Sequence, residues 1–460
     1  LQNLDPHSSY IPKQDLMSIT ENMKGDFIGI GVQFYIYKDS IAVIRAIEGG
    51  PSFRAGIKAG DRILIADDDT LYGQNWSESK VIERLRGQKN SKVQLKIKRE
   101  GVDSLRNFEI IRSEVPIKSV VASYMINSTL GYIKINRFAE STYLEFENNI
   151  EDLISKGALN LVLDLRDNSG GFLQIAMQIA DEFLEDGKLI LFTKNKTNKI
   201  DKSFATVKGR FEEAEVYVLI NENSASASEI VAGALQDNDR GTIIGRRSFG
   251  KGLVQQEMDL GDGSAIRLTT SRYYTPTGRS IQRSYDKGSE AYYDDYYKRL
   301  ENRAEDTLQW NALVDSLTFT TPKGKIVYGG GGIIPDVYVP YDANFNNDIV
   351  EYLKVSGIMD FFVFEYLDGQ RAQYTALSEA EFLSDFEISE DFYQQFISNF
   401  SERMSLKKEE LHIYKNALKI LLKSAFAKQF FGDNTAAKVM STFDPMLQKT
   451  TDIEAALISN

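Results

Sequence analysis

The sequence predicts an α/β multidomain protein, in which a small β-rich module precedes a layered core and a helical region follows it. Short apolar strands and glycine turns fill residues 25–113, and strands alternate with helices after about residue 114. Helical periodicity dominates from about residue 344 to the end. With 460 residues, of which 42% are hydrophobic, the chain is long enough to bury more than one core.

Composition excludes several classes of function. The 54 basic and 66 acidic residues give a net charge of −12, which opposes the basic surface expected of a nucleic-acid-binding protein. Cysteine is absent, so the chain has no disulfide framework, thiol nucleophile or zinc ribbon. No apolar stretch approaches the roughly 20 residues that span a bilayer, and no signal peptide is visible. The abrupt start at Leu1-Gln2-Asn3 is compatible with removal of a targeting or anchoring segment.

The sequence of residues 1–113 predicts two structural parts, a lead-in and a β-rich module. Residues 1–24 are expected to form a partly helical lead-in, with the turn Leu4-Asp5-Pro6-His7-Ser8-Ser9-Tyr10 at its head, packed on another part of the protein. Residues 25–113 then predict the β-rich module. Its expected elements are strands at 27–32, 41–44, 59–64 and 93–98 and a helix at 77–85.

The core is expected to cover residues 114–343, with a tyrosine-rich surface insertion at about 285–325. Its continuous apolar runs are typical of buried strands in a layered α/β sheet. The expected strands are 130–138, 159–165, 216–220 and 242–245, the helices are 142–156, 172–184 and 226–235, and a hairpin covers 253–274. Four glycines, residues 329–332, predict a tight crossing back to the core, and residues 344–460 are expected to form a helical region.

Ser226 is the candidate nucleophile. It lies between a predicted strand and the helix that carries Ile230 and Leu235, so it is expected at a helix N-terminus. Backbone N–H groups point outward there and favour negative charge, so the N–H of Ala227 could donate to an oxyanion. The plainer alternative is that Ser224, Ser226 and Ser228 only cap the helix.

Lys251, 25 positions after Ser226, is the candidate base. The only histidines are His7 and His412, and both are remote in sequence from every candidate reactive segment. The chain therefore offers almost no histidine from which a Ser-His-Asp triad could be built. A lysine in an apolar pocket can lose its proton near neutral pH and then accept one from a hydroxyl. The alternative is an ordinary solvated lysine. Gln255, four residues on, could orient the ammonium if this segment is a strand.

Two glycine-containing loops are candidate binding elements. Gly170 and Gly171 follow a buried strand that ends near Asp164, and their amides could make a second oxyanion contact. A plain strand-to-helix turn or an ion-pair network is the alternative. In the β-rich module, Gly29-Ile30-Gly31 could form a nest for a terminal carboxylate. Arg86 is either a solvated helix-end charge or a carboxylate contact or interdomain sensor.

Five segments together carry a specific resemblance. They are SASASEIVAGALQD at 224–237, GKGLVQ at 250–255, LDLRDNSGG at 163–171, YTPTGRSIQ at 274–282 and GIIPD at 332–336. In their order along the chain they resemble the signature blocks of the carboxy-terminal processing proteases, the tail-specific serine peptidases of family S41. The similarity runs from about Leu4 to Val339.

The resemblance implies a PDZ domain at 25–113, a crotonase- or ClpP-like peptidase core at 114–343, and a role for each candidate. It implies Ser226 as nucleophile, Lys251 as general base and Gln255 as the group that positions the lysine. Oxyanion amides would come from Ala227 and from Gly170 or Gly171, with Asp237 in support. Peptide binding would involve Gly29, Ile30, Gly31 and Arg86. The chain departs from the pattern at Ser169, where many members carry proline, which could loosen the oxyanion loop.

The resemblance further implies a serine endopeptidase with a Ser-Lys dyad, which cleaves unfolded proteins near a C-terminus that the PDZ domain recognises, without metal or cofactor. It allows a homo-oligomer through the terminal helical regions, a membrane anchor outside this chain, and a location in the periplasm or cell envelope. Two other classes of function stay open. One is a catalytically inactive PDZ scaffold that binds peptides, and the other is a crotonase-type enzyme acting on acyl thioesters.

Overall fold

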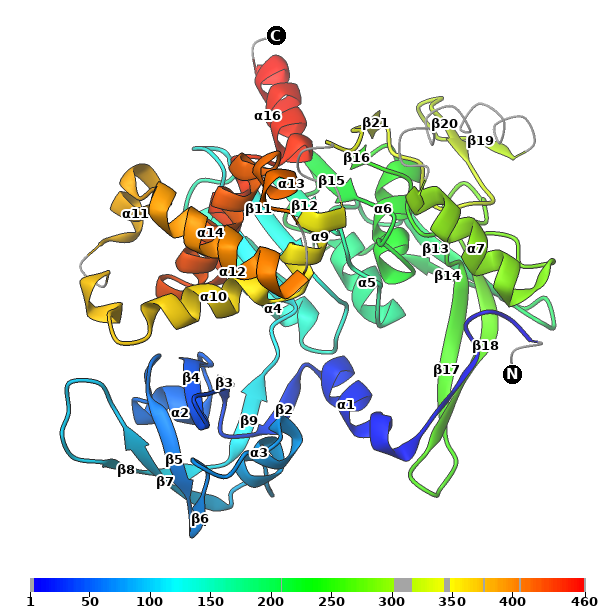
Figure 1. Ribbon diagram of the computed structural model, residues 1–460. Coiled ribbons are helices and arrows are strands. Elements are labelled where there is room, and N and C mark those ends of the chain that lie inside the picture. The colour runs from blue at the N-terminus through cyan, green and yellow to red at the C-terminus, as the bar shows by residue number, and fades with distance from the viewer. Residues whose placement is uncertain are drawn as a thin grey trace. The chain divides into compact units, whose positions relative to one another are not determined.

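The computed structural model describes residues 4–207, 209–301, 317–342, 348–374, 377–404 and 407–458 (Figure 1). The chain forms two compact units, each built from segments distant in sequence. The first consists of Leu1–Gly25, Lys118–Tyr341 and Phe443–Asn460, and the second of Asp26–Ile117 and Asp342–Thr442. Part of the predicted insertion at 285–325 lies outside the described residues.

A six-stranded sheet forms the centre of the first unit. Its strand order is β10-β11-β12-β15-β16-β21, with only β10 antiparallel to its neighbour. Every residue of β15 is buried, as expected for an apolar run inside a parallel sheet. The strands are β10 (Val120–Met125), β11 (Leu130–Ile135), β12 (Asn160–Asp164), β15 (Val216–Ile220), β16 (Thr242–Gly245) and β21 (Val337–Tyr338).

Helices cover this sheet because alternate strand residues point to opposite faces. Leu163 and Val218 belong to one apolar cluster with residues of α4 (Thr142–Ser155), α5 (Leu173–Asp181) and α6 (Ala227–Asp237). Tyr217, which alternates with Val216 and Val218, donates its hydroxyl to Glu454 of α16 (Pro445–Ile458) at 2.5 Å. The last helix of the chain therefore belongs to the core unit, although residues 344–460 were expected to form one helical region.

A second sheet of the first unit contains the predicted hairpin. β17 (Leu253–Asp259) and β18 (Ala265–Tyr274) pair antiparallel, in agreement with the prediction for 253–274. β18 also pairs with β1 (Ser9–Ile11) in the lead-in, which continues into α1 (Lys13–Lys24). Three strands of this sheet were not predicted from the sequence: β1, β13 (Leu189–Asn195) and β14 (Ile200–Phe204). The insertion contributes α7 (Gly288–Glu301), and β19 (Thr318–Thr320) and β20 (Ile326–Tyr328) form a separate hairpin.

A buried ion pair fixes the end of α6. The guanidinium of Arg279 lies 2.7 Å from Asp237 Oδ1, and both side chains are completely shielded from solvent. Asp237 also accepts from the hydroxyl of Thr277 at 2.6 Å, and Gln236 Oε1 accepts from Arg279 at 2.6 Å. The segment that follows β18 is therefore tied to the C-terminal end of α6.

The β-rich part of the second unit is a sheet of order β3-β4-β5-β7-β8, with β6 paired to β5 and a separate pair of β2 and β9. β3 lies at the edge of this sheet, so its outer edge has no neighbouring strand in the described structure. Helix α3 (Glu78–Leu85) begins at Ser77, whose side chain accepts from the N–H of Lys80. The strands are β2 (Asp26–Gly29), β3 (Val32–Tyr37), β4 (Ser40–Ala46), β5 (Arg62–Ala66), β6 (Asp69–Thr70), β7 (Lys92–Lys98), β8 (Arg106–Ile111) and β9 (Ser113–Pro116), and α2 (Pro51–Ala55) is the second helix.

The helical part of the second unit has its own apolar core, rich in phenylalanine. Residues 407–430, within the region expected to be helical, contain two helices with a break at Ile413 and Tyr414. The helices are α9 (Asp348–Val355), α10 (Ile358–Leu367), α11 (Glu379–Asp385), α12 (Glu390–Met404), α13 (Lys408–His412), α14 (Lys415–Phe430) and α15 (Asp433–Ser441). This part forms one compact unit with the β-rich part.

Replacing Asp237 by alanine should reduce the free energy of unfolding of the first unit by about 3–5 kcal/mol, because Arg279 would stay buried without its anion. Chemical denaturation followed by circular dichroism measures the loss. Asp152→Ala is the matched control, because Asp152 pairs with Lys156 on the surface at 2.6 Å. The control should change stability by less than about 1 kcal/mol, and an equally small effect of Asp237→Ala would contradict the expectation.

Candidate active site

Ser226 lies at the N-terminus of α6, as the sequence predicted, in a backbone conformation unusual for a non-glycine residue. Its φ is 53° and its ψ is −110°. Such residues cost free energy and persist only where the surroundings hold them. The neighbouring serines help to hold this conformation, because their hydroxyls donate to backbone carbonyls. Ser224 donates to Leu165 at 2.8 Å, and Ser228 donates to Asn168 at 2.9 Å. The three serines therefore do not share one capping role.

Lys251 is a largely desolvated lysine. Its Nζ donates to Gln255 Oε1 at 2.9 Å, which joins two residues that the sequence singled out. Burial is the largest cause that lowers the pKa of Lys251, and the nearby cation of Arg267 lowers it further. The charges of Glu229 and Asp5 act in the opposite direction. The amide of Gln255 orients the ammonium without adding a negative charge that would stabilise it.

Glu229 connects the segments that carry Ser226 and Lys251. Its carboxylate is completely buried and accepts from the N–H of Ser226 at 2.8 Å. The same carboxylate accepts from the N–H groups of Gly250 at 2.6 Å and Lys251 at 2.8 Å, and from the Ser248 hydroxyl at 2.5 Å. Burial raises the pKa of Glu229, whereas these donors act to lower it. Glu229 was not identified from the sequence, because its contacts with residues 248–251 carried no local signal.

Tyr273 makes a second link between these segments. Its buried hydroxyl lies 3.0 Å from the carbonyl oxygen of Lys251 and 3.2 Å from that of Ser226. Tyr273 is on β18, so the hairpin helps to hold the start of α6 beside the lysine segment. This residue was also not identified from the sequence.

The turn with Gly170 and Gly171 packs directly on the start of α6. A Cβ atom at Gly170 would lie 2.9 Å from Ser226 Cβ and 3.0 Å from the Ala227 nitrogen, and Gly170 has a φ of +105°. A side chain therefore has no room at this position. The N–H of Gly170 donates to Asn168 Oδ1 at 2.9 Å, so it is engaged within the turn in this structure.

The start of this turn is an ion-pair network, one of the alternatives that the sequence left open. Asp164 is completely buried and lies 2.6 Å from Arg166, which also pairs with Asp444 at 2.6 Å. Although burial alone would raise it, Arg166 and Lys134 hold the pKa of Asp164 below its usual range. The network fixes the end of β12 and hence the glycine turn that follows.

The lead-in turn lies against the lysine site, although His7 is remote in sequence. The carbonyl oxygen of His7 accepts from Gln255 Nε2 at 2.6 Å. Asp5 shapes the turn by accepting from the N–H groups of His7 at 2.8 Å and Ser8 at 2.9 Å. Burial, with the nearby charge of Lys251, lowers the pKa of His7 to about 4, so its ring is neutral at pH 7. The ring contacts the hydroxyl of Tyr292 on α7 at 3.1 Å.

Asp237 lies at the opposite end of α6 from Ser226. Its contacts are the buried pair with Arg279 and the bond to Thr277. If Asp237 supports the site, it does so indirectly, because it fixes the positions of α6 and of the segment after β18.

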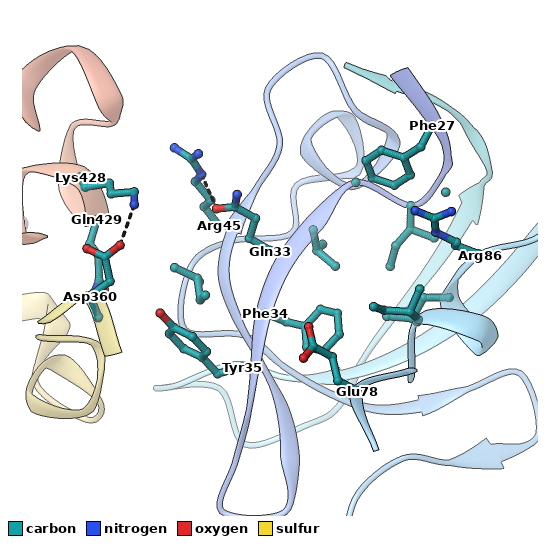
Figure 2. A pocket seen from close by; sticks show the side chains of 17 residues that line it. Phe27, Gln33, Phe34, Tyr35, Arg45, Glu78, Arg86, Asp360, Lys428 and Gln429 are labelled. Atoms are coloured by element: carbon teal, nitrogen blue, oxygen red, sulfur yellow. Dashed lines mark hydrogen bonds and ion pairs between the residues drawn. The ribbon is translucent and has the colours of Figure 1, made fainter. Parts of the chain in front are cut away.

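The peptide-binding candidates line one cavity of about 440 Å³ in the second unit (Figure 2). Gly29, Ile30 and Gly31 precede the edge strand β3, and Arg86 follows α3, so the cavity runs between that strand and that helix. The Arg86 guanidinium lies over the Phe27 ring, 5.0 Å from its centroid. Apolar side chains of both elements form the floor, among them Val32, Phe34, Ile82 and Leu85.

No described helix is long and apolar enough to cross a membrane. Within the same part of the chain, no group of three or more histidine, aspartate or glutamate side chains is arranged to hold a metal ion.

Three family models match the chain. Residues 129–288 match peptidase family S41, residues 29–110 match the PDZ domain, and residues 349–432 match a family of unknown function, DUF8443. The PDZ match covers the β-rich part of the second unit, and the unknown family covers most of its helical part.

The chain is similar to several curated and solved proteins. It is 39% identical over 286 residues to a carboxy-terminal-processing protease of Bartonella bacilliformis, covering 61% of this chain and 65% of that protein. It is 33% identical to a carboxyl-terminal-processing protease of a Picosynechococcus species, covering 68% of this chain and 76% of that protein. A probable CtpA-like serine protease of Staphylococcus aureus is 34% identical, over 60% of this chain and 55% of its own length.

Among solved structures, the photosystem II D1 C-terminal processing protease is 29% identical, with a TM-score of 0.35 over 60% of this chain and 75% of that one. The matched region spans just under two thirds of the Bartonella protein and about half of the staphylococcal one. The similarity to the Picosynechococcus protein covers three quarters of its length and agrees with the matched family model. The chain belongs to peptidase family S41.

Proposed function

We propose that this chain is a serine endopeptidase that uses Ser226 and Lys251 as a dyad and cleaves unfolded proteins whose C-terminal tails bind its PDZ domain. The observation that carries the proposal is the buried Glu229 carboxylate, which accepts from the N–H groups of both Ser226 and Lys251. It joins the backbones of a serine and a lysine that are 25 residues apart in sequence, which supports a shared site. The desolvation of Lys251 supports its role as the base.

In the proposed reaction, Ser226 Oγ attacks the peptide carbonyl carbon while neutral Lys251 accepts the hydroxyl proton. The negative charge on the carbonyl oxygen is stabilised by the N–H of Ala227 and by an amide of the glycine turn. Lys251 then donates the proton to the leaving amine, and the C–N bond breaks. Water, deprotonated by Lys251, hydrolyses the acyl-enzyme and restores Ser226.

For the glycine turn, this scheme favours the amide of Gly171. The N–H of Gly170 already donates to Asn168 Oδ1, so its use would require a change in the turn. Gln255 keeps Lys251 Nζ oriented through the cycle, and the carbonyl of His7 in turn keeps Gln255 oriented.

For the tail, we propose β-addition along the free edge of β3, with the terminal carboxylate at Gly29-Ile30-Gly31 and Arg86 beside it. A location in the periplasm or cell envelope and a homo-oligomer through the terminal helical regions are further proposals, which rest on the family resemblance.

Ser226→Ala and Lys251→Ala should each lower kcat for an unfolded protein reporter by about three orders of magnitude or more, because each removes a member of one catalytic unit. The assay is the release of fragments on a gel, with circular dichroism to establish that both variants are folded. Lys287→Ala, in the segment before α7, is a control with no assigned contact to the dyad. Full turnover by both dyad variants would remove this assignment.

The rate should rise with pH as Lys251 loses its proton, and Arg267→Gln should move that rise to higher pH. Arg267 is a cation that lowers the pKa of Lys251, so its removal raises that pKa and leaves less neutral lysine at a given pH. We expect a shift of about half a pH unit in the profile of kcat/KM. Arg272→Gln is the control, because Arg272 is on the same strand and donates to Tyr285. An equal shift in both variants, or a shift to lower pH for Arg267→Gln, would contradict the explanation.

Converting the C-terminal carboxylate of an unfolded substrate to an amide should raise its KM about tenfold, since a hydrogen bond to a charged group contributes roughly 1.5–3 kcal/mol. The value of kcat should change little, because in this proposal the carboxylate binds at the PDZ domain and does not contact the groups that act on the peptide bond. Parallel kinetics on the acid and amide forms measure the difference. Equal KM values would remove tail recognition while leaving the dyad assignment intact.

A further inference from the structure

The lead-in turn is closed by the side chain of Asp5, which is 7% exposed. Its Oδ1 accepts from the N–H groups of His7 at 2.8 Å and Ser8 at 2.9 Å, and its Oδ2 accepts from the Ser8 hydroxyl at 2.6 Å. Hydrogen bonds to an ionised carboxylate are stronger than those between neutral groups. One buried carboxylate therefore fixes the backbone of the turn.

The peptide unit between His7 and Ser8 links this turn to the lysine site. Because a peptide unit is planar, the carbonyl of His7 and the N–H of Ser8 cannot turn independently of each other. The N–H is held by Asp5 Oδ1, and the carbonyl oxygen accepts from Gln255 Nε2 at 2.6 Å. A carbonyl only accepts hydrogen bonds, so this contact directs the other end of the amide, Gln255 Oε1, to the ammonium of Lys251 at 2.9 Å. A continuous chain of hydrogen bonds thus runs from Asp5 to Lys251 Nζ.

Gln255 lies where the hairpin of β17 and β18 is irregular. The register shifts just before Gln255, which pairs with Thr269, so Thr270 is an extra residue in β18. Such bulges change the direction of nearby side chains and are frequent beside active sites. The N–H of Thr269 donates to the Ser8 hydroxyl at 3.2 Å. The lead-in turn therefore contacts both strands of the hairpin at the irregular position.

Contacts with α7 hold the turn on another side. The Tyr293 hydroxyl donates to the carbonyl of Pro6 at 3.0 Å, and the Tyr292 hydroxyl lies 3.1 Å from His7 Nε2. Directly after the turn, all three residues of β1 pair with β18 (Figure 1). The turn is therefore an ordered part of the first unit, and its carbonyl has a defined position beside Gln255.

Asp5 is also one of the charges that act on Lys251. Burial and the cation of Arg267 on β18 favour the neutral amine, whereas Glu229 of α6 and Asp5 favour the ammonium. The ring of His7, in the same turn, is neutral at pH 7 because burial lowers its pKa to about 4. Burial acts to raise the pKa of Asp5, but the donors of the turn lower it overall, so Asp5 is an anion at neutral pH.

We propose that Asp5 is a positioning residue of the Ser-Lys dyad. Through the peptide unit that follows His7, it orients Gln255 and hence Lys251 Nζ. The proposal rests on the proposed dyad and adds the lead-in turn to it. The charge of Asp5 has a separate effect, since a nearby anion keeps the lysine protonated to higher pH. The two effects can be separated, because asparagine retains the Oδ1 acceptor and lacks the charge.

Asp5→Ala should lower kcat for an unfolded protein reporter about tenfold or more, because Lys251 loses its orientation. KM should change little, since the residues proposed to bind the tail are untouched. Asp5→Asn should retain most of the maximal kcat, because its Oδ1 can still accept from both N–H groups and its Nδ2 can donate to the Ser8 hydroxyl. Circular dichroism establishes whether both variants are folded.

In Asp5→Asn, the rise of kcat/KM with pH should move to lower pH by about half a unit, opposite to the shift expected for Arg267→Gln. A general loss of structure would not give this shift together with a retained maximum. Asp262→Asn is the matched control: Asp262 also accepts from the N–H and the hydroxyl of one serine, Ser264, at 2.8 and 2.6 Å, but it lies in the loop between β17 and β18. The control should leave the profile in place. This readout needs no alanine variant, so it stands even if Asp5→Ala does not fold.

A double-mutant cycle tests the route through Gln255. Gln255→Ala already breaks the chain of hydrogen bonds, so adding Asp5→Ala should lower kcat by less than about twofold further. A tenfold further loss, or an unshifted pH profile in Asp5→Asn, would overturn the inference and leave the dyad in place. Full turnover by Lys251→Ala would instead remove the dyad itself, and the inference with it.

Discussion

The carboxylate of Glu229 is the contact on which the candidate site depends. A buried carboxylate is costly unless several donors satisfy it, and here all four described donors belong to the two segments that carry Ser226 and Lys251. Satisfying Glu229 therefore requires the start of α6 and residues 248–251 to lie together. The same contact stabilises the unusual backbone of Ser226, since its N–H is one of the donors. The core therefore cannot satisfy Glu229 without also bringing together the two segments of the candidate site.

Lysine desolvation adds a second constraint on the site. Burial favours the neutral amine that the proposed reaction needs, but Glu229 and Asp5 favour the ammonium. The cation of Arg267 opposes these two carboxylates, and the other contacts add no charge: Gln255 is a neutral acceptor, and the His7 ring, whose pKa is lowered to about 4, stays neutral. The lead-in turn thus contributes a carbonyl that fixes Gln255, although His7 is 248 residues away from Gln255 in sequence.

Local patterns explain what could be predicted from the sequence and what could not. β15 and β16 were predicted with their observed bounds because continuous apolar runs identify buried strands, and Ser226 was expected at a helix start because such starts have a local signature. β13 and β14 were missed because their polar residues give no clear alternation, and β13 is held by pairing with the distant β18. The roles of Glu229 and Tyr273 depend on contacts between segments, which residue spacing cannot reveal. The placement of α10 on β3, where Phe361 lies against Tyr35, had a signal that went unused, since α10 is apolar on nearly all its sides.

The two candidate sites belong to different compact units, and this division bears on how their roles can be separated. The cavity beside β3 is built entirely from residues of the second unit, whereas Ser226 and Lys251 belong to the first. In the proposed function, tail binding and cleavage therefore depend on different residues. A change at Gly29-Ile30-Gly31 would weaken the docking of tails and leave the groups that act on the peptide bond in place, whereas a change at Lys251 would stop cleavage and leave the docking surface in place.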